Sequence, residues 1–260
     1  MTITSIPTLP ITGGRIPVVG LGTWQSEGDE AATAVVAAIE LGYRHIDTAT
    51  GYGNEAEVGR ALRAARIGRD DVFLTTKLPP DHAGRERRTL MDSLAALGVD
   101  HLDLWLVHWP PHGQATPSTW QAFREARDEG LVRSIGVSNY SIEQIDELVA
   151  VTGEAPAVNQ IPYGPNDHDL ALLAAHRERG VVVEGYSPLK RVDLRASAIV
   201  EAAQAHGVTA AQVVLRWHVQ HDVVVIPKSV RPERLRENLD VLGFTLDDGQ
   251  MAAIDALGHR

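Results

Sequence analysis

Residues 102–108 read Leu102-Asp103-Leu104-Trp105-Leu106-Val107-His108, an apolar run that ends in an ionisable side chain. Two earlier segments have the same form: Arg44-His45-Ile46-Asp47 ends in an aspartate and Val72-Phe73-Leu74-Thr75-Thr76-Lys77 ends in a lysine. Each run is typical of a buried β-strand. Polar residues at the ends of consecutive parallel strands are what a closed α/β barrel uses for its active site. The three segments therefore predict both the fold and the location of the site.

The rest of the chain continues this alternation of strand and helix. Amphipathic helical patterns occupy residues 30–41, 55–65, 85–97, 118–129, 142–151, 170–179 and 210–220. Including the three segments above, eight strands are expected, at residues 18–22, 45–47, 73–77, 102–108, 134–138, 157–160, 181–186 and 223–227. An N-terminal hairpin is expected around Gly13-Gly14, and an extra C-terminal helix at residues 247–257. Five glycines are expected to end helices: Gly42, Gly98, Gly130, Gly180 and Gly207.

The length of 260 residues is close to that of one (β/α)8 TIM barrel. We therefore expect a single domain of the α/β class that spans residues 1–260. A doubly wound open sheet is the alternative, because the sequence does not show whether the first strand pairs with the eighth. The even spacing of eight units favours closure.

Composition and charge exclude several classes of function. A net charge of −10 argues against a nucleic-acid binder, which needs a broad basic surface. The chain contains no cysteine, and hence no disulfide framework or thiolate metal site. The first seven residues lack the features of a signal peptide, and no apolar segment is long enough to span a membrane. We expect a cytoplasmic protein that acts on a small molecule, without a bound metal and as a monomer.

Four side chains near the strand ends form one candidate chemical group: Asp47, Tyr52, Lys77 and His108. A tyrosine hydroxyl has an ordinary pKa near 10 and donates its proton poorly at neutral pH. A neighbouring ammonium group stabilises the phenolate and lowers that pKa, and an aspartate keeps the ammonium charged. A histidine can hydrogen-bond a substrate oxygen. Such a group can protonate a carbonyl oxygen while hydride arrives at the carbon.

Each of the four residues also has an ordinary structural interpretation. Asp47 can cap a helix, and Tyr52 can be a loop aromatic between two glycines. Lys77 can extend to solvent, and His108 can be a buried core histidine. These interpretations stay open for each residue alone, whereas the combination at successive strand ends favours the chemical one.

Longer motifs surround these residues. They are Gly42-Tyr43-Arg44-His45-Ile46-Asp47-Thr48-Ala49 with Tyr52-Gly53-Asn54-Glu55, Thr75-Thr76-Lys77-Leu78, Leu106-Val107-His108-Trp109-Pro110, Ser134-Ile135-Gly136-Val137-Ser138-Asn139-Tyr140, Val158-Asn159-Gln160, Gly185-Tyr186-Ser187-Pro188-Leu189 and Ile226-Pro227-Lys228-Ser229. Together they resemble the aldo-keto reductases nearly from end to end, especially bacterial members of the 2,5-diketo-D-gluconate reductase type. The resemblance implies a nicotinamide cofactor bound without a Rossmann domain and reversible reduction of aldehydes or ketones. It also implies roles for the four residues: Tyr52 as general acid, Lys77 and Asp47 as residues that tune its pKa, and His108 as the residue that orients the carbonyl.

The same resemblance assigns residues to the cofactor. Ser138, Asn139 and Gln160 would hydrogen-bond the nicotinamide carboxamide, and Tyr186 would stack on the nicotinamide ring. Ser187 and Leu189 would line the path of the pyrophosphate. Helix capping remains an ordinary alternative for the Ser138-Asn139 pair.

A basic stretch, Lys228-Ser229-Val230-Arg231-Pro232-Glu233-Arg234, stands out in this acidic chain. It follows the last strand and opens a helix, and a helix N-terminus with arginine side chains attracts phosphate. A solvated helix start is the alternative. The resemblance implies NADPH rather than NADH, with the adenosine 2′-phosphate held by Lys228, Ser229 and Arg234 and the adenine approached by Glu237 and Asn238.

Trp24 and Trp109 each follow a barrel strand, so we expect them to wall the substrate pocket. The sequence departs from the family pattern at Ile161-Pro162-Tyr163-Gly164-Pro165, where relatives carry a glutamate and a His-Pro pair. It also ends at Arg260, without the tail that commonly folds over the site. These departures predict an open pocket with broad carbonyl specificity.

Two rival functions compete with that of a reductase. An NADPH-binding redox sensor or regulatory subunit of the same fold would not need Tyr52 or Lys77. A metal-dependent barrel hydrolase would need clustered histidines at strand ends, and the sequence has neither H-E-x-x-H nor H-x-H. The complete group of four residues favours the reductase.

Overall fold

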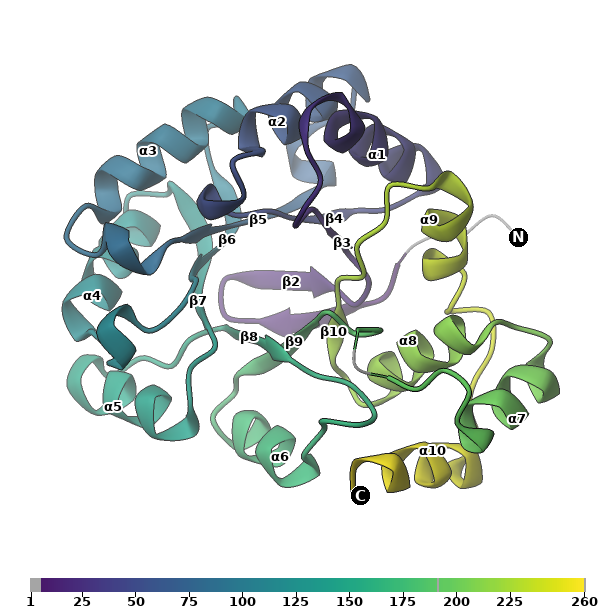
Figure 1. Ribbon diagram of the computed structural model, residues 1–260. Helices are drawn as coiled ribbons and strands as arrows, with labels where there is room; N and C mark the ends of the chain where they lie inside the picture. Colours follow the sequence, from purple (N-terminus) through teal and green to yellow (C-terminus); the bar gives the residue numbers. More distant parts are fainter. Residues whose placement is uncertain (1–5, 191, 260) are drawn as a thin grey trace.

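In the computed structural model, residues 6–190 and 192–259 are described. The expected absence of a signal peptide falls partly on residues 1–5, which lie outside this range. Eight parallel strands surround a central axis in chain order, with helices outside them (Figure 1). The strands are β3 (Leu21–Gly22), β4 (His45–Asp47), β5 (Phe73–Leu78), β6 (Leu102–Val107), β7 (Val132–Ser138), β8 (Val158–Pro162), β9 (Val182–Tyr186) and β10 (Val224–Val225).

The sheet closes on itself between its first and last strands. Parallel bridges join Val19 to Val225 and Gly22 to Lys228. The backbone N–H of Gly20 donates to the Val225 carbonyl at 2.9 Å. This pairing confirms the (β/α)8 barrel and excludes the open sheet.

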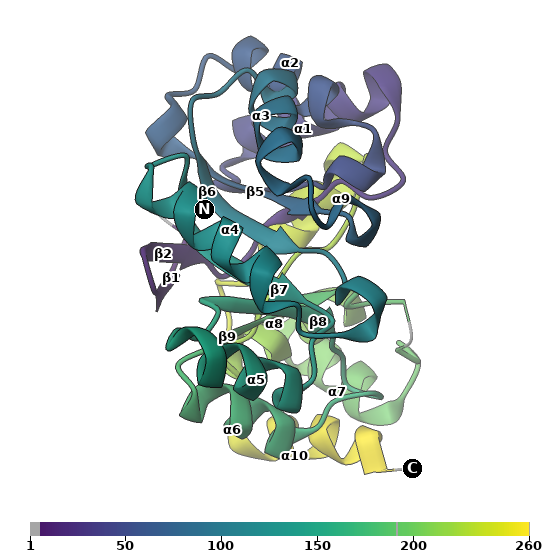
Figure 2. The ribbon, with the colours of Figure 1, turned by 90° about the vertical axis from the view of Figure 1, so that its left-hand side faces the viewer.

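An antiparallel hairpin, β1 (Thr8–Ile11) and β2 (Gly14–Pro17), covers the N-terminal end of the barrel (Figure 2). Ile16 of the hairpin is fully buried and joins an apolar cluster inside the barrel that includes Leu104 and Val224. The turn requires Gly13, because its φ is +94° and a Cβ there would lie 2.2 Å from the Arg133 carbonyl oxygen. The hairpin therefore closes the N-terminal end of the barrel, and the opposite end remains available for a functional site.

The surrounding helices are α1 (Gly28–Leu41), α2 (Glu55–Ala64), α3 (Glu86–Leu97), α4 (Pro117–Asp128), α5 (Ile142–Thr152), α6 (Leu170–Glu178), α7 (Ser197–His206), α8 (Ala210–Gln220), α9 (Pro232–Leu239) and α10 (Asp248–Asp255). The five glycines expected to end helices all have positive φ. The C-terminal helix is confirmed as α10, which Asp247 caps and a short 3-10 helix (Ala256–His259) extends. Helix α7 was not among the expected helices, although Gly207 at its end was expected to terminate one.

Candidate active site

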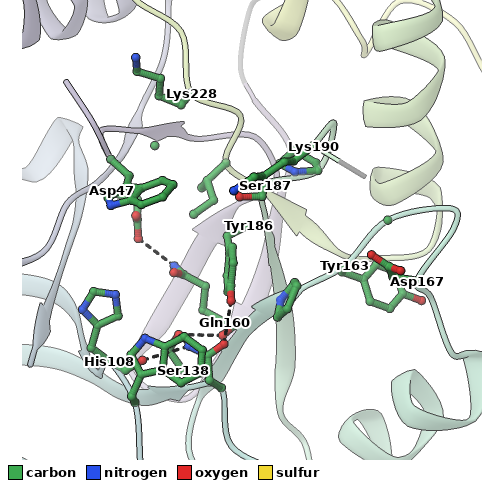
Figure 3. Close-up of a pocket in the computed structure, with 18 of the residues that line it drawn as sticks. Asp47, His108, Ser138, Gln160, Tyr163, Asp167, Tyr186, Ser187, Lys190 and Lys228 are labelled. Carbon is green, nitrogen blue, oxygen red and sulfur yellow. Dashed lines mark hydrogen bonds between the residues drawn. The ribbon is translucent and has the colours of Figure 1, made fainter. Parts of the chain in front are cut away.

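A cavity of about 460 Å³ opens at the carboxyl ends of the barrel strands. Figure 3 shows Asp47, His108 and Ser138 on one side of the cavity and Tyr163 and Asp167 on the other. The expected site residues among its lining are Trp24, Asp47, Tyr52, His108, Trp109, Ser138, Asn139, Gln160, Tyr186, Ser187 and Lys228. Barrel closure thus brings together side chains from seven strand ends.

Lys77 lies beneath the cavity lining and is completely buried. Its Nζ donates to Asp47 Oδ1 at 2.6 Å and to the Thr48 carbonyl at 2.8 Å, and it lies 3.4 Å from Tyr52 Oη. Burial alone would lower the pKa of Lys77, but Asp47 and Tyr52 outweigh it and raise that pKa. The lysine is therefore charged, and its three hydrogens are directed to three residues, Asp47, Thr48 and Tyr52.

Tyr52 follows β4 in a short 3-10 helix (Thr50–Tyr52). Lysine has no acceptor atom, so Tyr52 Oη must accept the hydrogen bond from Lys77. The tyrosine hydrogen is then free to be donated into the cavity. This hydrogen-bond geometry therefore favours donation of the Tyr52 proton to a ligand in the cavity.

The pKa of Tyr52 is raised, whereas the sequence analysis predicted that Lys77 would lower it. Lys77 does lower it, but burial has the larger effect and the pKa lies above the ordinary value of 10.0. The sequence could not show this, because the degree of burial depends on the closed barrel around the hydroxyl. A raised pKa keeps the tyrosine protonated at neutral pH.

His108 lies next to Tyr52 at the end of β6. The two rings meet edge to face with their centroids 5.6 Å apart. Burial, together with the charge of Lys77, lowers the pKa of His108 to about 3. The imidazole is therefore neutral at pH 7 and can donate one N–H to an oxygen without adding a second cation.

The expected nicotinamide contacts form one connected group. Asn139 Nδ2 donates to Ser138 Oγ at 2.9 Å, and Ser138 Oγ donates to the Gln160 carbonyl at 2.8 Å. Tyr186 Oη donates to Asn139 Oδ1 at 2.9 Å, which anchors the ring while the ring itself lines the cavity. Asn139 and Ser187 adopt positive φ values of 63° and 53°. Such backbone strain in non-glycine residues is common at functional sites.

The basic stretch after β10 lies along one edge of the cavity. Lys228 is exposed and lines the cavity, whereas Ser229 is buried and accepts from the Arg231 N–H at 3.1 Å. Arg234 is exposed in the first turn of α9 and forms no ion pair with the described residues. Glu237 is exposed and Asn238 is buried on the same helix. None of these except Lys228 lines the cavity itself.

The Leu189 side chain packs against the apolar core and does not line the cavity, so its expected place on the pyrophosphate path stays a prediction. Lys190, the next residue, does line the cavity, and its Nζ lies 5.5 Å from the centre of the Trp24 ring. The sequence motif ended at Leu189, so it gave no reason to choose Lys190.

The unusual segment after β8 forms one wall of the cavity. Pro162, Tyr163 and Gly164 line it, together with Asn166 and Asp167. The Tyr163 ring stacks on Trp217 of α8 at 5.7 Å, and its carbonyl oxygen lies 2.9 Å from His218 Nε2. Trp24 and Trp109 also line the cavity and are each about half exposed, at 47% and 49%.

Two buried ionisable residues near the site were missed by the sequence reasoning. Glu184 lies within β9, where the sequence reads Val181-Val182-Val183-Glu184-Gly185, and His45 lies in β4. Burial, then the charge of Asp47, raises the pKa of Glu184 to about 8. Burial lowers the pKa of His45 to about 3. For Glu184, the sequence signal that could have revealed a buried ionisable group was an acidic residue inside an otherwise apolar strand.

Comparison with known proteins is consistent with this site. The model of the aldo/keto reductase family matches residues 18–259. The chain is 46% identical to 2,5-diketo-D-gluconic acid reductase B of Corynebacterium over 97% of the chain and 94% of that protein. It is 43% identical to morphine 6-dehydrogenase of Pseudomonas putida over 94% of the chain and 88% of that protein. The chain therefore belongs to the aldo/keto reductase family and is an oxidoreductase.

Solved structures lead to the same family. An aldo/keto reductase from Brucella melitensis superposes with a TM-score of 0.93 at 40% identity, over 97% of this chain and all (100%) of that one. The Bombyx mori aldo-keto reductase, solved in complex with NADP, has a TM-score of 0.89 at 32% identity, over 99% of this chain and 95% of that one.

Within the described residues no helix is both long and apolar enough to cross a bilayer, and no group of three or more acidic or histidine side chains is arranged to hold a metal ion.

Proposed function

We propose that this protein reduces aldehydes and ketones to alcohols with NADPH, and that Tyr52 is the general acid. The observation that carries the proposal is the hydrogen-bond geometry around Lys77. Because the ammonium group donates to Tyr52 Oη, the tyrosine proton is available to a carbonyl oxygen in the cavity. When bound, NADPH supplies the hydride, and the protein supplies the proton, the orientation and the exclusion of water.

The residues present are suited to such a cofactor. Tyr186 offers a ring face held in place by its hydrogen bond to Asn139. Gln160 offers an amide at the bottom of the cavity, and Lys228 offers a cation at its edge. Arg234 adds an exposed guanidinium at the start of α9, which suits a phosphate on the adenosine ribose. We assign the carboxamide to Ser138, Asn139 and Gln160, the ring to Tyr186, the pyrophosphate path to Ser187 and Leu189, and the adenosine phosphate to Lys228, Ser229 and Arg234, with Glu237 and Asn238 near the adenine.

The substrate carbonyl would lie between Tyr52 and His108. The neutral imidazole of His108 donates to the carbonyl oxygen, and Tyr52 passes its proton to the same oxygen. As the proton leaves, Lys77 stabilises the phenolate, and Asp47 keeps the lysine charged. The indoles of Trp24 and Trp109 provide apolar walls without charged groups of their own. We infer broad specificity for neutral carbonyl compounds from these half-exposed walls.

A panel of carbonyl compounds tests this function. NADPH oxidation is followed with activated aromatic aldehydes, aliphatic aldehydes, α-dicarbonyls and cyclic ketones. Turnover of several classes with comparable kcat/KM supports the proposal. Turnover of one bulky compound alone contradicts broad specificity, and NADPH binding without any turnover contradicts the reductase function.

A further inference from the structure

A carboxyl group lies inside the barrel, below the cavity. Glu184 is the third residue of β9 and is completely buried. Strand register places it beside Gln160 of β8. Its Oε2 accepts from Gln160 Nε2 at 2.9 Å, while its Oε1 lies 3.6 Å from His45 Nε2 and accepts no hydrogen bond from the described residues. Burying such a group is costly, and no step proposed for Tyr52 uses it.

Two carboxyl groups hold the Gln160 amide at once. Gln160 Nε2 donates to Asp47 Oδ2 at 2.8 Å and to Glu184 Oε2 at 2.9 Å; the contact with Asp47 is drawn in Figure 3. An amide nitrogen carries two hydrogens, so both are used inside the barrel. Gln160 Oε1 accepts from none of the described residues, and the side chain lines the cavity. The amide therefore presents an acceptor, not a donor, to a ligand.

The two hydrogen bonds have different effects on the amide. The bond to Asp47 keeps the nitrogen end of the amide pointing into the barrel, because a carboxylate repels the amide oxygen. A single bond still allows the amide to rotate about it. Both hydrogens of an amide lie in its plane, so the second bond, to Glu184, fixes that plane and with it the direction of Oε1.

We propose that Glu184 is a positioning residue for the nicotinamide: with Asp47 it fixes the Gln160 amide so that Oε1 accepts a hydrogen bond from the carboxamide NH2. This inference rests on the proposed function, since it assumes that the nicotinamide binds at Gln160. Glu184 touches neither cofactor nor substrate in this account. Glu184 affects cofactor binding only through the orientation of Gln160 Oε1.

The experiment compares two ligands that differ only at the group concerned. NADP⁺ carries the carboxamide NH2, whereas its 3-acetylpyridine analogue has a methyl group there and cannot donate. Equilibrium Kd values for both are measured by fluorescence titration on wild type, Glu184→Met and Glu184→Gln. The glutamine variant keeps an acceptor for Gln160 and can direct its own NH2 to His45, whereas the methionine variant offers no such acceptor. Glu201→Met, on the exposed face of α7, is the matched control.

We expect wild type, Glu184→Gln and the Glu201→Met control to prefer NADP⁺ over the analogue by about tenfold, as one hydrogen bond predicts. In Glu184→Met the preference should fall to about twofold or less. Binding of 2′,5′-ADP, which has no nicotinamide, should be unchanged in every variant. A merely structural role for Glu184 would weaken both dinucleotides equally.

Other outcomes are equally informative. A preference that stays near tenfold in Glu184→Met overturns the inference, and so does a wild type that does not discriminate between the two ligands. Failure of wild type to bind NADP⁺ at all would refute the proposed function instead. If the methionine variant does not fold, Glu184→Asp withdraws the carboxyl by one methylene from Gln160 and tests the same point.

Discussion

Replacing Glu184 by glutamine should stabilise the protein at alkaline pH and leave its stability nearly unchanged at acid pH. The pKa of this buried carboxyl is raised from 4.5 to about 8, because of burial first and the charge of Asp47 second. Lys77 and the Gln160 hydrogen bond act in the opposite direction but do not prevail. His45, whose Nε2 lies 3.6 Å from Glu184 Oε1, is neutral in this range because its pKa is about 3.

The sign follows from proton counting. Below pH 4.5 the carboxyl is protonated in both folded and unfolded chains, so it has no effect on stability. Between pH 4.5 and about 8 the folded state keeps a proton that the unfolded state releases, so stability falls as pH rises. The full cost, reached above pH 8, is up to about 5 kcal/mol. For a chain of this length that corresponds to roughly 9 °C in Tm.

The assay is thermal unfolding of wild type, Glu184→Gln and the control Glu201→Gln between pH 5 and pH 9. Glutamine has nearly the shape of a protonated glutamate, so the two proteins should melt alike at pH 5. At pH 9 the variant should melt at least about 4 °C higher, which allows for partial relaxation around the charge. Melting temperatures that differ by a constant amount at every pH would refute the reasoning, because they would show that Glu184 does not hold a proton in the folded state.

Three further predictions follow from individual contacts. Lys77→Met leaves Asp47 buried without its partner, so it should lower the free energy of unfolding by about 3–5 kcal/mol, measured by urea denaturation, and abolish turnover. Arg234→Ala should raise the KM for NADPH at least about tenfold and change the KM for NADH little; equal effects would contradict a phosphate contact. Gly13→Ala should destabilise the protein by at least about 2 kcal/mol, because of the positive φ and the Arg133 carbonyl, without altering kcat.

Much of the fold could be predicted from the sequence because its signals are local. Apolar runs such as 102–108 identified strands, and glycines such as Gly42 marked helix ends. Barrel closure could only be favoured, since it depends on pairing between residues as far apart as Val19 and Val225. Helix α7 was missed because the crossover from β9 to β10 contains two helices, whereas a regular βα unit contains one.

The candidate site also combines residues that local sequence signals could identify with properties that depend on the folded barrel. Asp47, Lys77 and His108 could be chosen because each ends a strand. The direction of hydrogen bonding around Tyr52, and the net upward shift of its pKa, depend on burial that only the closed barrel creates. Glu184 lies in the interior of a strand, so an argument from strand ends could not find it. Leu189 was chosen from a motif, and the motif did not show that its side chain faces the core.

The most direct test of the account is the reduction of an activated aromatic aldehyde by wild type and by Tyr52→Phe, with NADPH binding measured on both. Phenylalanine keeps the ring beside His108 and removes only the hydroxyl that Lys77 contacts. We predict that both proteins bind NADPH with similar Kd values and that the variant loses at least about a hundredfold in kcat. A variant that keeps its kcat would contradict the role of Tyr52 as general acid. If neither protein turns over while both bind NADPH, a cofactor-binding sensor becomes the better account.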